Sequence, residues 1–245
     1  MVERRPFQGV SNVVRFNWPV YIASVGSVLL LTILGFAIDS WQQLFFAMAL
    51  FGVSFTALTL FATWYIYDRS PLYELEWLEH GLDQNARVLV IHSGFDELST
   101  IIDSKFKPKE LDIVDFYDPI ENPEPSIARA RKIYPSDHST TLQLESPEFP
   151  STGYTHIFFF FAAHEIREEN TRIRLFSALK EVMAPEGKLF VTEHLRDVNN
   201  YAIYAHGALH FLSQKTWTQT FVRSELTLVK HLRITPFVHN FTLCR

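Results

Sequence analysis

Two long runs of uncharged, mostly apolar residues dominate the first part of the chain. They span residues 19–38 and 44–66, and the polar segment 39–43 separates them. A helix of ~20 apolar residues is long enough to cross the ~30 Å hydrocarbon core of a bilayer. Aromatic residues stand near the ends of both runs, as at membrane interfaces: Trp18, Trp41, Trp64, Tyr65 and Tyr67. The pattern predicts a transmembrane hairpin of two helices within a first domain of residues 1–69.

Basic residues predict the orientation of this hairpin. The segment before the first run carries Arg4, Arg5 and Arg15, and the turn between the runs carries no basic residue. Lys and Arg concentrate on the cytoplasmic side of membrane helices, so both ends of the hairpin and the following domain are predicted to be cytoplasmic. Small residues in both runs could let the helices pack closely, with each other or with those of a second copy. The alternative, which we favour, is that they reflect the ordinary composition of membrane helices. The alternatives are two core helices of a soluble protein, or a signal peptide, which fits poorly because a second run follows.

After residue 69 the pattern changes to short apolar segments that alternate with amphipathic ones. Strands are expected at residues 88–92, 111–116, 140–144, 155–162 and 188–192. Helices are expected at residues 72–82, 98–105, 126–134, 168–183 and 199–224. Two closing strands, 226–234 and 237–243, predict an antiparallel hairpin at one edge of the sheet. Alternating strands and helices favour an α/β domain over residues 70–245, doubly wound around a mostly parallel seven-stranded sheet.

Composition and charge narrow the range of partners. The chain is 47% hydrophobic with 22 Phe, and the apolar excess lies before residue 68. The net charge of −5 comes from the part after residue 69, where 18 basic and 24 acidic residues give −6, whereas residues 1–69 carry +1. Nucleic-acid binding needs clustered Lys and Arg, so we expect no nucleic acid as a partner. Cys244 is the only cysteine, which excludes an internal disulfide and any multi-cysteine metal site.

The segment 87–99 is the expected centre of the second domain. Residues 88–92 form a buried strand in this interpretation, Gly94 a tight turn, and the residues from Leu98 onward the start of a helix. Such a strand, turn and helix place backbone N–H groups at the carboxyl edge of a sheet. Nucleotide-like ligands bind at this edge.

Three further segments carry a family resemblance. Residues 159–166 are similar to a fourth strand and its following turn, and residues 179–189 to a "L-x-x-V-L-K-P-G-G-x-L" turn into a fifth strand. Glu145 stands four residues before Phe149-Pro150, where the family has an acid before "L-P". With these motifs, residues 72–245 resemble the class I S-adenosylmethionine-dependent methyltransferases. The glycine-rich loop departs from that family, because only Gly94 of its three glycines is present.

The resemblance implies S-adenosylmethionine as cofactor and assigns roles to several residues. Gly94 would let the backbone approach the methionine part, and Asp96 or Glu97 would face its ammonium group. Asp115 would accept the ribose hydroxyls, with Asp118 as a second candidate, and Glu145 would accept from the adenine amino group. The implied cofactor-binding residues are therefore Gly94, Asp96, Asp115, Asp118, Glu145 and Phe161. The alternative is that Asp115 and Asp118 only cap turns.

Polar residues after the fourth and fifth strands are the catalytic candidates. His164 follows the fourth strand, and Glu193 and His194 end the fifth, so all three are expected at one edge. Either histidine could deprotonate a hydroxyl or thiol acceptor, because histidine titrates near neutrality. Arg196 could hold an anionic group of the substrate. The alternative is a structural network that ties the loops together.

A second pair of histidines raises the question of a metal ion. His206 and His210 lie four residues apart on a predicted helix and share one face. With His194 or Glu193 they could form a metal site. One such pair is a weak indication, so no metal ion is predicted.

Together these features favour a membrane-anchored methyltransferase with a small, lipophilic acceptor such as a quinone, isoprenoid or phospholipid. A second hypothesis is an inactive methyltransferase-like scaffold in a membrane complex, because the glycine loop is degenerate. A third is a different cofactor chemistry on the same fold.

Overall fold

A computed structural model describes residues 4–78, 81–120, 123–135 and 138–245. The described chain forms two compact units, Arg4–Ser70 and Pro71–Arg245. Each unit has its own internal packing and is described by itself below.

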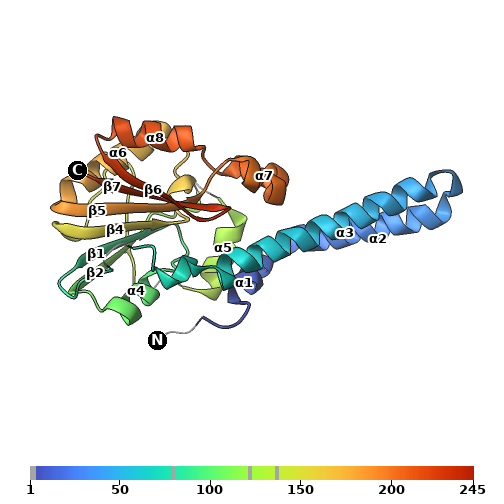
Figure 1. The fold of residues 1–245 in the computed structure, drawn as a ribbon, viewed down its shortest axis with the longest axis horizontal. Helices are drawn as coiled ribbons and strands as arrows, with labels where there is room; N and C mark the ends of the chain where they lie inside the picture. Colours follow the sequence, from blue (N-terminus) through green and yellow to red (C-terminus); the bar gives the residue numbers. More distant parts are fainter. Residues whose placement is uncertain (1–3, 79–80, 121–122, 136–137) are drawn as a thin grey trace. The chain divides into compact units, whose positions relative to one another are not determined.

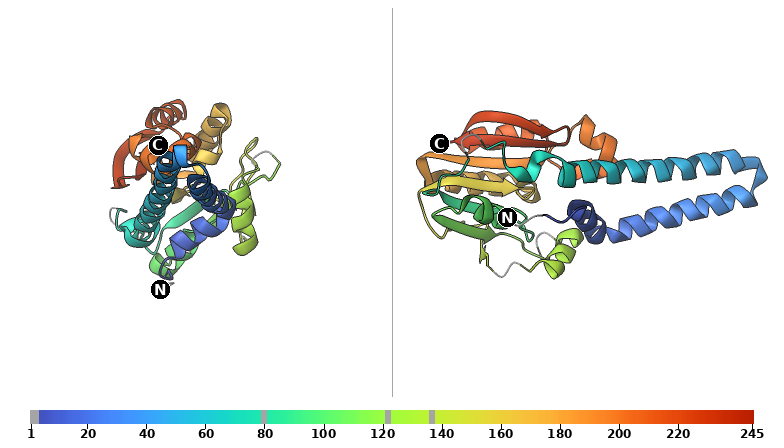
Figure 2. Two further views of the ribbon diagram at one scale, coloured as in Figure 1. Left: turned by 90° about the vertical axis from the view of Figure 1, so that its right-hand side faces the viewer. Right: turned by 60° about the horizontal axis from the view of Figure 1, so that its bottom comes forward.

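The first unit is a helical hairpin. Its elements are α1 (Gln8–Phe16), α2 (Trp18–Ala37), the 3-10 turn η1 (Asp39–Trp41), α3 (Gln42–Trp64) and the π-helical turn η2 (Tyr65–Arg69). Figure 2 shows α2 and α3 side by side and antiparallel, joined by η1. Gly35 lets the ring of Phe46 approach, because a Cβ at this position would lie 2.6 Å from that ring. The hydroxyl groups of Ser24 and Thr56 also form a hydrogen bond of 2.9 Å between the two helices.

Large apolar side chains point outward along both helices. They include Val20, Ile22, Leu29, Leu30, Ile33, Phe36, Leu50, Phe51, Val53 and Phe61. Phe36 and Phe51 are 73% and 71% exposed, whereas soluble monomers rarely expose apolar surface this continuous. By length and composition, both helices are suited to cross a membrane.

The two ends of the hairpin are tied together by Asp68. Its carboxylate accepts hydrogen bonds from the amides of Gly9 (2.7 Å) and Val10 (2.9 Å), at the start of α1. Gly9 is required here, because a Cβ would lie 2.3 Å from the Cβ of Tyr67. The segment before the first long helix therefore lies beside the segment that follows the second.

Replacing Asp68 with alanine should loosen α1 without unfolding the hairpin. The carboxylate satisfies two N–H groups of the first helical turn, and loss of such a cap costs ~1 kcal/mol. Hydrogen exchange should show faster exchange of the Gly9 and Val10 amides, whereas Asp39→Ala in the exposed turn leaves their protection unchanged. Equal protection in both variants would show that Asp68 does not hold the helix.

The second unit is built on a seven-stranded sheet of order β3-β2-β1-β4-β5-β7-β6 (Figure 1). Its strands are β1 (Arg87–His92), β2 (Glu110–Asp115), β3 (Thr140–Thr141), β4 (Tyr154–Phe160), β5 (Met183–His194), β6 (Thr227–Thr235) and β7 (Val238–Cys244). Strands β1 to β5 are parallel, and β7 runs antiparallel between β5 and β6. The predicted mostly parallel, seven-stranded α/β sheet and its closing hairpin are confirmed.

Helices cover both faces of the sheet in Figure 1. They are α4 (Ser99–Phe106), α5 (Pro125–Ile133), α6 (Glu169–Val182), α7 (Val198–Tyr204) and α8 (Gln214–Arg223). The main core lies under α6 and α8. There Phe176, Trp217 and Phe221 are fully buried and pack against one another and against Phe159 and Phe241 of the sheet.

Four predicted elements are wrong in detail. The described part of the predicted helix 72–82 contains only the 3-10 turn η3 (Pro71–Glu74), because Leu75 adopts a positive φ of 55°. Residues 79–80 lie outside the described chain. The third strand is shorter, limited to Thr140–Thr141. The turn expected within residues 179–189, before the fifth strand, is instead an irregularity within β5, where pairing with β4 shifts between Tyr154 and His156.

The predicted helix 199–224 is divided into three pieces. Between α7 and α8 lies the 3-10 turn η5 (Ala205–His210), which begins where Ala205 adopts a positive φ of 47°. Ser213 then begins α8, and its hydroxyl oxygen accepts from the Thr216 amide at 3.1 Å. The break matters for the site, because it places His210 at the end of a 3-10 turn rather than on a continuous α-helix.

Candidate functional site

The strand order defines where a ligand would bind. Successive strands run outward from β1 through β2 to β3 on one side, and from β4 to β5 on the other. In such sheets the ligand crevice lies beyond the carboxyl ends of the strands, at the point where the order reverses. Two groups of polar residues lie at these strand ends, one after β1 and β2 and the other after β4 and β5.

The first group is centred on Asp115, the last residue of β2. This side chain is 6% exposed, and its Oδ1 accepts hydrogen bonds from the amides of Gly94 (2.7 Å) and Tyr117 (2.9 Å). Its Oδ2 forms an ion pair with Arg131 of α5. The predicted pair of Gly94 and Asp115 thus forms one structural unit, in which both carboxylate oxygens already accept from the protein.

Gly94 needs to be glycine for two reasons. Its φ is +80°, which other residues rarely adopt. A Cβ at this position would also lie 2.6 Å from Ile127 Cγ2 and 3.0 Å from Tyr117 Cγ. The side chains of Ile127, Tyr117 and Arg131 therefore lie next to the glycine turn, with the Arg131 guanidinium 5.0 Å from the centre of the Tyr117 ring.

The other predicted cofactor residues lie in different settings. Asp96 caps the start of α4, since its Oδ1 accepts from the amides of Leu98 (2.8 Å) and Ser99 (3.0 Å). Asp118 accepts a hydrogen bond from the Ile120 amide at 2.7 Å. It therefore caps a turn, which was the alternative to a role in ribose binding. Glu145 is exposed. The ring of Phe161, at the end of β4, stacks on His194 with centroids 4.9 Å apart.

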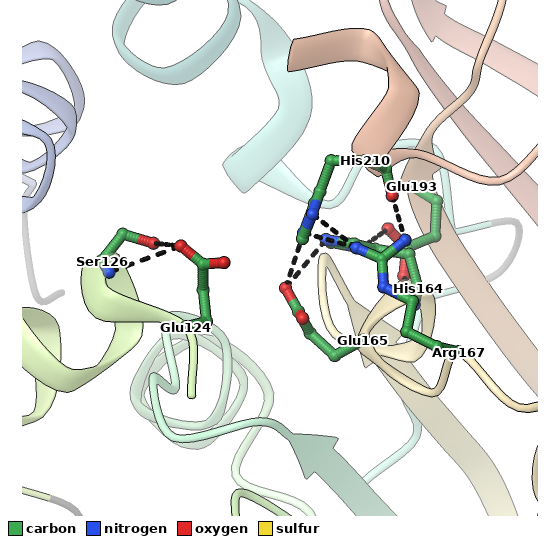
Figure 3. Close-up of polar contacts among 7 residues, drawn as sticks. All are labelled: Glu124, Ser126, His164, Glu165, Arg167, Glu193 and His210. Atoms are coloured by element: carbon green, nitrogen blue, oxygen red, sulfur yellow. Dashed lines mark hydrogen bonds and ion pairs between the residues drawn. The ribbon is translucent and has the colours of Figure 1, made fainter. Parts of the chain in front are cut away.

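The second group joins the ends of β4 and β5 (Figure 3). His164 lies in the 3-10 turn η4 (Ala163–Glu165), and its Nδ1 is 2.6 Å from Glu193 Oε2. On the other side of the ring, Nε2 is 3.2 Å from Glu165 Oε1, which is also 3.0 Å from Nε2 of His210. Glu193 is fully buried, and His164 and Glu165 are each 7% exposed. We call these four residues the His164 cluster.

Electrostatics in the His164 cluster couple the charges of its members. Burial by itself lowers the pKa of His164, but the carboxylates of Glu193 and Glu165 outweigh it and raise this pKa to about 10. Burial acts to raise the pKa of Glu165, and its contacts with His164 and His210 overcome that effect, so the pKa ends well below its ordinary value. An imidazolium therefore lies between two buried carboxylates.

His194 occupies an apolar setting next to this cluster. Its ring lies between those of Phe161 and Phe211, both with centroids 4.9 Å away, and its Nδ1 is 2.9 Å from the carbonyl oxygen of Phe237. Burial lowers the pKa of His194 to about 4. The two predicted histidines therefore differ in charge near neutral pH, because His194 is neutral and His164 is protonated.

The sequence interpretation missed three members of these groups. Glu165 follows His164 directly after β4, and this position in the sequence could have identified it as a member of the site. His210 appeared only as a partner of His206, but His206 is exposed and His210 faces Glu165. Arg131 had no local signal, because its partner Asp115 lies sixteen residues earlier.

Buried neutral histidines give the domain an acid-sensitive stability. The His156 ring lies beside the stacked rings of Phe158 and Phe190, with centroids 6.3 and 5.9 Å away, and its burial, aided by Lys188, lowers its pKa to about 4. The unfolded chain binds a proton near pH ~6.5 and the folded one only near pH 4, so stability is lost as pH falls through this window. After allowance for partial exposure, we expect a loss of about 2 kcal/mol from this residue.

Thermal melts of His156→Gln should therefore depend less on pH between 6.5 and 4 than those of the native chain. His206→Gln, at an exposed position, is the matched control and should follow the native curve. Parallel curves for all three proteins would contradict the assignment.

The arrangement of strands, helices and polar edge is the class I methyltransferase fold. An O-methyltransferase family 2 protein from Planctomyces limnophilus, solved in complex with apigenin, matches with TM-score 0.50 and 15% identity, over 78% of this chain and 62% of that one. This chain thus spans less than two thirds of that protein. A methyltransferase from Aquifex aeolicus matches with TM-score 0.50 and 14% identity, over 78% and 96% of the two chains.

A third solved structure extends the comparison over nearly the whole chain. The mitomycin 7-O-methyltransferase MmcR matches with TM-score 0.52 and 16% identity, over 99% of this chain and 73% of its own. No protein-family model matches the sequence, and no curated protein sequence matches it. At these identities the likeness establishes the fold, which agrees with the family resemblance found in the sequence.

Proposed function

We propose that the protein is a membrane-anchored methyltransferase that uses S-adenosylmethionine and methylates a lipophilic acceptor at the cytoplasmic face. The observation that carries this proposal is the pairing of two polar groups across the sheet's switch point. The Gly94–Asp115 unit lies after β1 and β2, where a nucleoside binds in this fold, and the His164 cluster lies after β4 and β5.

The residues of the first group suit the cofactor by chemical type. Asp115 is a carboxylate at the end of β2, suited to accept ribose hydroxyls. The side chains of Ile127, Tyr117 and Arg131 lie against the Gly94 turn, so a cofactor reaches its backbone only if these side chains move. The cofactor, when bound, supplies a methyl group activated on a sulfonium. Arg131 forms an ion pair with Oδ2 of Asp115, so ribose binding at this oxygen requires the ion pair to open.

Arg131→Ala should therefore raise the affinity for S-adenosylmethionine several-fold, because the ribose hydroxyls no longer compete with a guanidinium. Lys132→Ala, an exposed neighbour on α5, is the control and should bind as the native chain does. Calorimetry on both variants in detergent checks this. If Arg131→Ala binds more weakly, the guanidinium supports the site rather than blocking it.

The second group supplies the polar environment for the acceptor. Its buried carboxylates and histidine stand at adjacent strand ends, and Phe211 and Tyr204 pack against His194 beside them. An apolar wall with a few polar groups suits a lipophilic molecule that bears one reactive oxygen. Placement of that oxygen in line with the methyl group provides much of the catalysis in such a reaction.

The helical hairpin supports the choice of acceptor class. Two helices with outward apolar side chains anchor the chain where lipophilic molecules concentrate. To test the function, membranes from cells that express the protein would be incubated with methyl-labelled S-adenosylmethionine, and the lipid extract analysed by mass spectrometry. We expect a labelled lipid that is absent with Glu193→Gln; label confined to water-soluble products would reject the lipophilic acceptor.

One observation favours the scaffold hypothesis as a second candidate. Both oxygens of Asp115 are satisfied by protein groups, as they would be in a domain that no longer binds a nucleoside. The two hypotheses differ in cofactor binding. A scaffold binds no S-adenosylmethionine either as the native chain or as Arg131→Ala.

A further inference from the structure

Three ligand atoms of the His164 cluster converge on one point. Nε2 of His164 is 3.2 Å from Oε1 of Glu165, and the same oxygen is 3.0 Å from Nε2 of His210. All three atoms lie within 4.8 Å of one another. Ligand atoms that share a tetrahedral zinc ion at bond lengths of ~2.0–2.1 Å stand ~3.3 Å apart, so this spacing suits a single ion with small side-chain adjustments.

The fourth member of the cluster holds His164 in the orientation that a metal ligand needs. Glu193 is fully buried, and its Oε2 lies 2.6 Å from His164 Nδ1, while its Oε1 accepts from the His164 amide at 3.2 Å. A proton on Nδ1 directed at this carboxylate leaves Nε2 to bind an ion on the opposite side of the ring. Histidines that bind metals usually donate their other N–H to a carboxylate in this manner.

We propose that His164, Glu165 and His210 bind a divalent transition-metal ion, with zinc as the expected occupant and Glu193 as the carboxylate that orients His164. Two imidazoles and one carboxylate form the ligand set of catalytic zinc sites, which leave a fourth position open. Nitrogen ligands select against Mg²⁺ and Ca²⁺, and the lack of sulfur ligands selects against Cu(I). Figure 3 shows the three side chains directed toward one another from two separate segments of the chain.

Arg167 is the residue that competes with the ion. Its Nη2 lies 2.5 Å from Nδ1 and 2.9 Å from Nε2 of the His210 ring, and its Nη1 contacts the His210 carbonyl oxygen. A guanidinium and a metal ion cannot share the lone pair of one nitrogen, so the ion must displace this contact. The Arg167 side chain is exposed and can turn into solvent, so its displacement costs little free energy.

The ligand set differs from the one that the sequence suggested. His206 and His210 were the pair expected to share a helix face, but His206 is exposed and lies outside the cluster. His206 therefore provides a control variant on the same 3-10 turn. Glu165 replaces it as a ligand, next to His164 in sequence and 45 residues from His210.

The role of the ion deepens the proposed function and rests on it. An acceptor oxygen that occupies the open position loses its proton more readily, because a zinc-bound water has a pKa of ~7 against ~15.7 for bulk water. His164 serves as a ligand in this arrangement, so the ion, and not this histidine, would activate the acceptor oxygen. The acceptor class that follows is a phenol, enol or alcohol.

Zinc binding by the full-length chain tests the proposal without the cofactor. The protein in detergent would be stripped with a chelator and titrated with Zn²⁺ alone against a chromophoric competitor. We expect one Zn²⁺ per chain and a tetrahedral absorption spectrum with Co²⁺. His210→Ala, at a partly exposed position, should lower the affinity at least ~100-fold, and Glu193→Gln ~10–100-fold, as for other oriented ligands.

Two further variants make the result specific. His206→Ala should bind Zn²⁺ as the native chain does, and Arg167→Ala should bind it more tightly. The proposal is overturned if the native chain binds no Zn²⁺, or if His210→Ala and His206→Ala bind it equally well. A chain that binds Zn²⁺ at these residues but transfers no methyl group supports the metal site and rejects the proposed function.

Discussion

Replacement of Asp115 with alanine is expected to weaken S-adenosylmethionine binding at least ~100-fold. Two hydrogen bonds from ribose hydroxyls to a carboxylate contribute ~1.5–3 kcal/mol each, and every 1.4 kcal/mol is about tenfold in affinity. The same carboxylate also holds the amides of Gly94 and Tyr117, so its loss loosens the turn that faces the cofactor. Asp115→Asn keeps one acceptor oxygen, so its affinity for S-adenosylmethionine should lie between those of the native chain and Asp115→Ala.

The matched control for this variant is Asp118→Ala, which removes a carboxylate from the same loop. Asp118 caps a turn through the Ile120 amide, so we expect a change in affinity of less than about threefold, or ~0.6 kcal/mol. Melting curves would first confirm that each variant is folded. Native affinity in Asp115→Ala would mean that the ribose does not bind at the end of β2.

Labelling of single cysteines is expected to give opposite results for the two sides of the membrane. Cys244 is the only cysteine and is partly exposed at the end of β7. If the domain is cytoplasmic, a membrane-impermeant maleimide labels it only after the cells are permeabilised. In a Cys244→Ser background, Ser40→Cys in the exposed turn between α2 and α3 should be labelled in intact cells.

The physical basis of this prediction is the length and surface of the two helices. Each is at least 20 residues long and carries outward apolar side chains, so their burial in a bilayer removes far more apolar surface from water than their mutual packing does. The chain should also stay in the membrane pellet after an alkaline wash. Labelling of both positions in intact cells, or recovery without detergent, would contradict the hairpin.

Features set by local patterns could be read from the sequence. The apolar run of β1, the glycine turn after it and the closing strands around Pro236 were all found, because burial and turn chemistry act over a few residues. The parallel order follows from the alternation of strands and helices. Of the candidate site residues, Gly94 with Asp115 and His164 with Glu193 lie in direct contact.

Features set by contacts between distant residues could not be read in this way. The segment around Gly187 pairs irregularly with β4 because its backbone lies close to the Tyr154 carbonyl oxygen. A Cβ on residue 187 would lie only 2.6 Å from that oxygen. Arg131 meets Asp115 only after α5 has packed onto the sheet. His210 reaches Glu165 because η5 interrupts the helix that periodicity predicted.

The central claim is that the carboxyl edge of β1 and β4 binds S-adenosylmethionine despite a single remaining glycine. Isothermal calorimetry of the full-length chain in detergent, with S-adenosylmethionine as the only ligand, tests it most directly. We expect saturable binding of one cofactor per chain that strengthens in Arg131→Ala and is lost in Asp115→Ala. An absence of heat and of any thermal shift in both the native chain and Arg131→Ala would contradict the enzymatic function and leave an anchored scaffold.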